Sequence, residues 1–174
     1  FLYSLYSGKM EVKIDDTILN KKNLSGYIKR FLPKTKHADS FLKVIEENER
    51  VVSEKKNFHN MGYLNLRLLY YPDAIKKILV VRKSGMKIAD ISALPKAIPF
   101  VGFLELEGKD LNTFFRNMEN PQHNAWEPKR PPNEQLARKY KNEIEEFINI
   151  INNIIEIEKK DGEIEEMLEW NIRR

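Results

Sequence analysis

Apolar and polar positions alternate with two different periods along the first fifty residues of this 174-residue chain. Positions three and four apart predict helices, and strict alternation predicts strands. The elements predicted in this way are a helix over 1–7, a β-hairpin over 10–19, a helix over 24–32 and a helix over 39–50. Residues that commonly turn the chain or begin and end helices separate them, namely Gly8, Asp15, Asp16, Asn23 and Pro33.

The middle of the chain carries the densest strand pattern. Three runs of β-branched, aromatic and alternating residues are bounded by Gly, Pro or Asp, namely MGYLNLRLLYYP (61–72), KKILVVRKSGM (76–86) and IPFVGFLELEG (98–108). Within the first run, Leu64, Leu66 and Leu68 share one face. The pattern predicts three antiparallel strands that form the sheet of the protein.

Helical spacing returns after residue 108. Residues 109–118 predict one helix, and a long amphipathic helix follows from Pro131, Pro132 and Asn133 with Asn152 and Asn153 on its solvent side. We expect Asp161-Gly162 to break it and a second helix to complete a helical hairpin. The predicted fold class is α+β, a small mostly antiparallel sheet with helices on one face plus this C-terminal helical part. The predicted domains are residues 1–130 and a helical extension over 131–174.

Composition narrows the classes of function. Apolar residues make up 41% and charged residues 32%, and Lys plus Arg exceed Asp plus Glu by 30 to 26, which is weak evidence for nucleic-acid binding. The absence of cysteine excludes disulfides, thiolate metal sites and a thiol nucleophile. Apolar windows fall short of the roughly 20 residues that a membrane-spanning helix needs. We therefore expect a cytoplasmic protein with no membrane contact, and the missing initiator Met suggests a fragment of a longer chain.

The usual signatures of an active site are missing. The histidines at positions 37, 59 and 123 form no HxxxH or HExxH pair, so we predict no metal site. Glu105, Glu107 and Lys109 resemble the acidic and basic cluster of a metal-dependent nuclease only weakly, because carboxylates at the end of a strand are usually solvated. There is no Walker A loop, GxSxG or GxGxxG. We expect no catalytic residues in this chain.

A basic turn is more informative. In VVRKSGMKI, residues 80–88, a strand ends in Arg82 and Lys83, turns at Ser84-Gly85 and resumes with Lys87. Three cations beside backbone amides that a glycine leaves accessible are typical of a phosphate-binding loop. The ordinary alternative is a solvated basic turn, which the sequence alone favours.

Several segments together resemble a known family. SGKMEVKIDD, ILNKKNL, VVRKSGMKI and GFLELEGKDLNTFFRNMENPQHNAWEPKR are similar to the region that follows the ATP-binding domain in bacterial MORC-like members of the GHKL superfamily. That superfamily includes gyrase-type topoisomerases, heat-shock chaperones, histidine kinases and MutL. The resemblance covers roughly residues 1–135, and ENPQHNAWEPKR is its most specific part.

The resemblance implies a transducer domain like the second domain of gyrase B. In such domains a basic residue on a loop reaches the terminal phosphate of ATP that the preceding domain holds, and Arg82, Lys83 and Lys87 are the candidates here. The Bergerat-type ATP site is missing, so this chain needs no cofactor of its own, whereas ATP and magnesium are implied for the full-length protein. Its implied partner is the upstream ATPase domain of the same chain, in a DNA-transacting ATPase of a restriction or phage-defence system.

The loop over 119–130 contains aromatic, acidic and basic residues but no run of apolar residues. Trp126 and Pro128 would fasten it to the domain by burying apolar area, worth roughly 2 to 3 kcal/mol for the indole. His123, Glu127 and Arg130 would then be its polar partners. The alternative is a contact surface for DNA, a partner subunit or the ATPase domain.

Two further alternatives stay open. The C-terminal helices pack on the domain or form the seam of a homodimer, because their spacing also suits a partner helix. The whole chain is either a transducer segment or a stand-alone module that binds nucleic acid or protein. Steep salt dependence of DNA binding would indicate the module.

Overall fold

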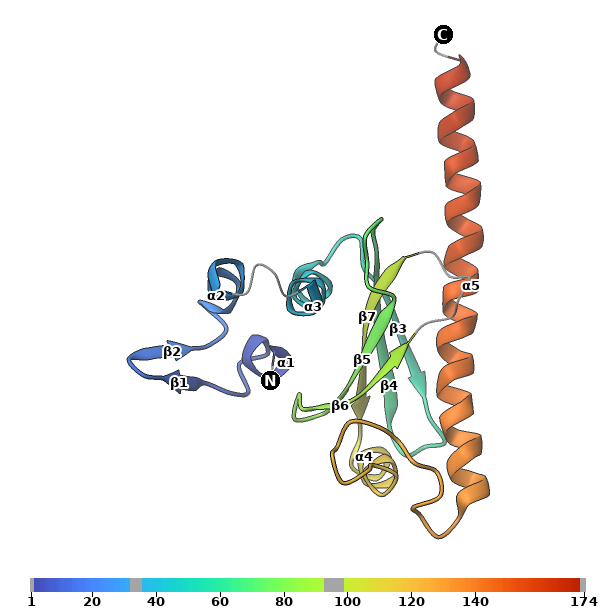
Figure 1. Ribbon diagram of the computed structural model, residues 1–174. Coiled ribbons are helices and arrows are strands. Elements are labelled where there is room, and N and C mark those ends of the chain that lie inside the picture. The colour runs from blue at the N-terminus through green and yellow to red at the C-terminus, as the bar shows by residue number, and fades with distance from the viewer. Residues whose placement is uncertain (1, 32–35, 93–98, 173–174) are drawn as a thin grey trace.

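The structure, a computed structural model, describes residues 2–31, 36–92 and 99–172. It confirms the predicted α+β class, with a mostly antiparallel sheet, several helices and a long C-terminal helix (Figure 1). The elements in chain order are α1 (Leu2–Tyr6), β1 (Val12–Ile14), β2 (Thr17–Leu19), α2 (Leu24–Phe31), α3 (Lys36–Glu46), β3 (Val52–Asn57), β4 (Tyr63–Tyr70), β5 (Lys77–Arg82), β6 (Lys87–Ser92), β7 (Phe100–Glu107), α4 (Lys109–Arg116) and α5 (Glu134–Ile172).

The N-terminal elements follow the predicted pattern. Strands β1 and β2 pair as an antiparallel hairpin, and the turn between them places Asp15 at a φ of 51°. Asn23 precedes α2 as expected, but its side chain bonds backward. Its amide donates to the carbonyl of Ile18 at 2.6 Å, and its oxygen accepts from the N–H of Asn20 at 2.9 Å. Asn23 therefore joins the hairpin to the helix, and Pro33 lies outside the described residues.

The main sheet has five strands in the order β3-β4-β7-β5-β6, so the prediction of three strands was incomplete. The predicted runs form β4, β5 and β7. β3 was missed because its sequence, VSEKKN, is almost entirely exposed and shows no apolar alternation. β6 forms where the chain resumes after the basic turn.

One strand pair is parallel, which fits the predicted mostly antiparallel sheet but corrects the expectation that the three predicted strands are all antiparallel. β5 and β7 run in the same direction, whereas the other three pairs of this sheet are antiparallel. The reason is topological. The chain reverses once into β6 and once again into β7, and β7 lies on the inner side of β5 with β6 left at the edge.

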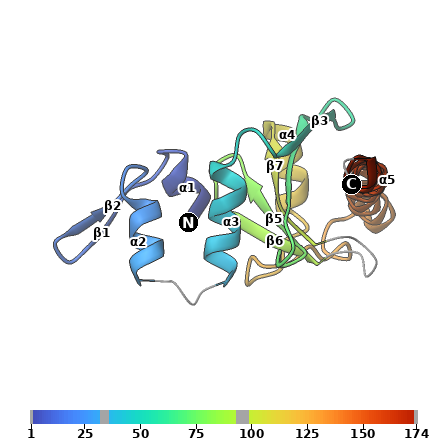
Figure 2. The same ribbon diagram turned by 90° about the horizontal axis from the view of Figure 1, so that it is seen from above.

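Helices cover both faces of the sheet, whereas we expected them on one (Figures 1 and 2). The face that carries Leu64, Leu66 and Leu68 packs against α4 and the first half of α5 in the largest apolar cluster. The other face carries Leu69, Val81 and Phe103, and packs against α1 and α3. Successive side chains of a strand point to opposite faces of the sheet. Because both faces are covered by helices, the central strands are apolar on both faces, and β5 is an almost continuous apolar run.

The long helix α5 corrects two expectations. It runs without interruption through Asp161-Gly162, so the predicted helical hairpin does not form. A single glycine inside a helix costs only about 1 kcal/mol, too little to end it without other signals. Asn152, expected on the solvent side, is 3% exposed, and its side-chain oxygen accepts a hydrogen bond of 2.5 Å from the Tyr70 hydroxyl.

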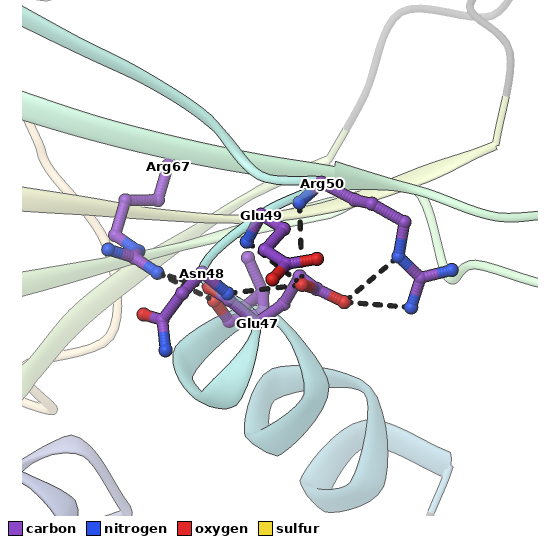
Figure 3. A network of polar contacts seen from close by, with 6 residues as sticks. Glu47, Asn48, Glu49, Arg50 and Arg67 are labelled. Atoms are coloured by element: carbon purple, nitrogen blue, oxygen red, sulfur yellow. Dashed lines mark hydrogen bonds and ion pairs between the residues drawn. The ribbon is translucent and has the colours of Figure 1, made fainter.

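The helix α3 ends at Glu46, four residues before its predicted end, because Glu47 redirects the chain (Figure 3). One carboxylate oxygen of Glu47 accepts the backbone N–H groups of Asn48, Glu49 and Arg50 at 3.0 to 3.3 Å, and the other accepts the guanidinium of Arg50. Arg67 of β4 donates to the Glu47 carbonyl at 2.7 Å. These bonds replace the next helical turn and lead the chain into β3.

Candidate anion-binding groove

The basic turn between β5 and β6 is fixed against the first helix. Gly85 has a φ of 83°, and a Cβ there would lie 2.6 Å from the Ser4 hydroxyl, so the close approach requires glycine. The Ser4 hydroxyl donates to the carbonyl of Ser84 at 3.1 Å. The ammonium of Lys9 donates to the carbonyl of Lys83 at 2.5 Å. The turn therefore has a set position beside α1.

Arg82, the first candidate in this turn, is held by a buried carboxylate. Its guanidinium donates twice to Glu119, with Nε 3.0 Å from Oε1. The side chain of Glu119 is 1% exposed, and its Oε2 also forms a hydrogen bond of 2.7 Å with Nδ1 of His123. The structure thus brings together two segments that the sequence analysis treated separately.

A groove of about 340 Å³ lies beside this turn, along one face of α4. The residues that line it are Arg82, Lys83, Gly108, Lys109, Asn112, Thr113 and Arg116. The four α4 residues share one face because their spacing of three and four matches the helical period. Among the lining residues that the structure describes, four side chains are cationic and none is a carboxylate.

Three of these cations are available for a ligand. The side chains of Lys83, Lys109 and Arg116 are exposed, and each forms no hydrogen bond or ion pair with any residue that the structure describes. Cations without a carboxylate partner in one concave surface attract anions, and a phosphate accepts several such bonds at once. The chemistry of the groove is therefore that of an anion site.

Lys87, the third candidate of the turn, does not reach this groove. Its ammonium pairs with Asp90 at 2.7 Å, and it lines a different pocket between α1, α3 and the sheet. The three cations predicted to act together are therefore in three different environments. Arg82 is paired with a buried carboxylate, and Lys87 is paired at the surface. Lys83 forms no hydrogen bond or ion pair with a described residue, although its charge helps to lower the pKa of Glu107.

The 119–130 loop is largely used for internal contacts. Trp126 is 7% exposed, and its ring lies 4.6 Å from that of Phe115 in the main apolar cluster. The loop returns onto α4 through the N–H of Glu127, which donates to the carbonyl of Met118 at 2.6 Å. Glu127 and Arg130 form an exposed pair at 3.7 Å, and the side chain of His123 is 63% exposed.

The carboxylates considered for a nuclease lie on one face of β7 but are engaged with other groups. The Tyr3 hydroxyl donates to Glu105, and burial of that phenol, together with this bond, raises its pKa. Hydrogen bonds from Asn65 at 2.8 Å and from Lys55 at 3.0 Å lower the pKa of Glu107. Among the described residues, no three His, Asp or Glu side chains lie close enough together to hold a metal ion.

Sequence reasoning found Arg82 and Lys83 but missed the α4 side of the groove. Lys109, Asn112, Thr113 and Arg116 have the spacing i, i+3, i+4, i+7 within a predicted helix, so their common face could have been identified. That this face lies next to the β5–β6 turn depends on the strand order, which was not predicted.

Comparison of the chain with protein-family models, with curated proteins and with solved structures finds no match. Within the described ranges, no helix combines the length and apolar character that crossing a membrane requires.

Proposed function

We propose that this chain is an accessory transducer-type segment of an ATPase of the GHKL superfamily, which contacts the phosphates of a nucleotide held by another domain. The observation that carries the proposal is the groove of Lys83, Lys109 and Arg116. These three cations form no hydrogen bond or ion pair with a described residue, and none of the described lining residues is a carboxylate. The proposed superfamily rests on the sequence resemblance described above. The proposed contact with phosphates rests on the cations of the groove.

The attachment of the turn to α1 supports a coupling role. Backbone carbonyls of Ser84 and Lys83 are held by side chains of α1 and of the segment after it. A phosphate that draws Lys83 toward itself would therefore pull on the first helix as well. Such a contact exists only while the phosphate is present, so it would report the state of the nucleotide.

Arg82 has a different role in this proposal from the one the sequence suggested. Because its guanidinium is bound to the buried Glu119, it shapes the wall of the groove and contributes less charge to a ligand than Lys83 does. Lys109 and Arg116 take the place of Lys87 as the cations that act with Lys83. The Thr113 hydroxyl adds a neutral donor on the same helical face.

The first experiment measures binding of inorganic tripolyphosphate to the chain by isothermal titration calorimetry at low ionic strength. Changing Lys83, Lys109 and Arg116 together to Ala should weaken binding at least about tenfold, because each charge-assisted bond contributes roughly 1.5 to 3 kcal/mol before salt screening. The matched control changes Lys13, Lys22 and Lys29 to Ala, which removes the same charge from exposed positions on the hairpin and around α2. Equal losses in the two variants would contradict a specific site.

The second experiment tests coupling in the intact protein that we propose. The Lys83→Ala substitution should lower ATP turnover while the protein keeps its fold and its affinity for ATP, because the nucleotide is held by the other domain. Unchanged turnover would contradict the transducer role and leave the groove as an anion site of another kind.

The same groove favours a second candidate, a stand-alone nucleic-acid-binding module. Exposed lysines and arginines without partners are the usual contacts to a phosphate backbone. In that case a duplex oligonucleotide should bind the chain more tightly than tripolyphosphate does, and its affinity should fall steeply as salt is added. A shallow salt dependence would exclude this candidate.

A further inference from the structure

The long helix α5 carries two apolar stripes, and the sheet covers one of them. The stripe that faces the sheet includes Ile144 and Ile148, which are 0% and 2% exposed. The second stripe consists of Ile150, Ile154 and Ile157, with exposed fractions of 50%, 46% and 62%. Ile150 follows Ile148 by two residues, which is about 200° around a helix axis, so the two stripes lie on different faces. The sheet that buries the first stripe therefore does not bury the second.

The second stripe begins where α5 leaves the sheet. Asn152 is bound to Tyr70 of β4, and from there the helix continues to Ile172 beside no other described element (Figure 1). Helices in water gain most of their stability when an apolar face packs against something else. We therefore expect this part of α5 to pack against another molecule.

The spacing of the exposed stripe identifies the kind of partner. Its residues are separated by four and three positions, and the sequence continues this alternation toward the C-terminus. An average of 3.5 residues is the repeat of a left-handed coiled coil, in which the a and d residues of neighbouring helices pack together. The a and d positions, which we call the seam, are Ile150, Ile154, Ile157, Asp161, Ile164 and Leu168. The partner is therefore a helix with the same repeat, which a second copy of the chain provides.

Charges beside the seam favour parallel copies. In a parallel coiled coil, position g of one helix meets position e of the next heptad on its neighbour, and here these positions are Lys160 and Glu165. In antiparallel helices g meets g and e meets e, which brings Lys160 toward Lys160 and Glu158 toward Glu158. Lys160 pairs with Glu156 of its own helix at 3.3 Å, but its side chain is 67% exposed. An exposed pair of this kind is worth little, so the ammonium is available to a neighbouring helix.

We infer that the part of α5 from Ile150 onward joins copies of this chain in a parallel coiled coil. Isoleucine at the d positions favours three or four helices over two, and the polar Asp161 at an a position would fix the register at some cost in stability. Both arrangements left open by the sequence then occur, since one stripe packs on the domain and the other joins the copies. No seam residue lines the basic groove, so this inference stands or falls separately from the proposed function.

Sedimentation equilibrium of the chain tests the inference. We expect a mass that is a multiple of the 20.6 kDa of one chain. Changing Ile154 and Ile157 to Ser should return the mass to that of a monomer and keep the fold, because neither residue belongs to an apolar cluster of the domain. The matched control changes Ile14 and Ile18 of the hairpin to Ser, which are 44% and 49% exposed, and should leave the mass unchanged. A monomeric chain, or equal effects of the two variants, would overturn the inference.

A single introduced cysteine tests the orientation, because the chain has none of its own. Ile150→Cys places a thiol at a d position, where parallel helices in register bring the same position of two chains together. Mild oxidation should then link two chains by a disulfide on a non-reducing gel. Glu156→Cys is the control, since its position c lies outside the seam and should give no such link. No link at position 150, or equal links at both positions, would contradict the parallel arrangement.

Discussion

The 119–126 loop and the exposed face of α4 are neighbours, but they differ in how far their side chains are bound within the protein. The loop is rich in unusual residues, yet Trp126 lies in the core and Glu119 is bound by Arg82 and His123. The α4 face looks ordinary in sequence, yet its Lys109 and Arg116 form no hydrogen bond or ion pair with any of the described residues. A segment that combines aromatic, acidic and basic residues is therefore not necessarily a ligand site. Side chains that have no partner within the chain are the better indicator.

The largest expected effect tests the structural side of this comparison. Trp126→Ala should lower the free energy of unfolding by about 3 to 5 kcal/mol, because it leaves a cavity beside Phe115 in the main cluster. Urea unfolding followed by circular dichroism measures the loss. Arg130→Ala, four residues away on the exposed surface, is the control and should change stability by less than about 0.5 kcal/mol. Similar losses for both variants would contradict the role assigned to Trp126.

The next effect concerns the buried carboxylate of the loop. Glu119→Gln keeps the shape of the side chain but removes the charge that Arg82 faces, and should cost about 2 kcal/mol because a partly buried guanidinium loses its counter-ion. Glu127→Gln is the matched control, since its pair with Arg130 is exposed and worth little. Equal stabilities of the two variants would show that the Arg82 pair does not hold the loop.

The α4 face should behave in the opposite way. Changing Lys109 and Arg116 to Ala should alter the free energy of unfolding by less than about 0.5 kcal/mol, because neither side chain bonds to a residue in the described part of the chain. A small gain in stability is also consistent, since like charges repel each other. A loss as large as that for Glu119→Gln would contradict the distinction between the two regions.

The smallest expected effect is the pH dependence of stability that comes from Glu47, at the far end of the sheet. Hydrogen bonds from Arg50, followed by the N–H groups of Glu49 and Arg50, lower the pKa of this carboxyl from the usual 4.5 to about 2. The unfolded chain therefore takes up a proton at higher pH than the folded chain does, so stability is lost as pH falls from about 4.5 toward 2. The loss between pH 5 and pH 3 should be smaller in Glu47→Gln, as measured by urea unfolding at each pH. Parallel pH profiles would contradict this.

Much of the fold could be predicted because its local patterns are strong. The hairpin at Asp15-Asp16, the alternating leucines of β4 and the helical spacing around Phe115 all appear where the sequence placed them. β3 could not be predicted because a polar edge strand has no apolar period. The continuity of α5 through Gly162 was missed because one poor helix former weakens a helix without ending it.

The candidate site could be predicted only in part. Arg82 and Lys83 were identified from a local turn pattern, which a single sequence can show. The pairing of Arg82 with Glu119 joins residues 37 positions apart, and the approach of α4 to the turn depends on the parallel pairing of β5 and β7. No local pattern in the sequence indicates either contact. The sequence analysis therefore grouped Lys87 with Arg82 and Lys83 and did not include Lys109 and Arg116, which line the groove.

The central claim is that Lys83, Lys109 and Arg116 form one phosphate site. Backbone amide chemical shifts recorded while tripolyphosphate is added test it most directly. The account predicts that the largest shifts fall on residues 83–85 and 108–116 and vary together with one binding constant. Shifts that spread equally to the lysines of the β1–β2 hairpin and α2, or that avoid α4, would contradict it.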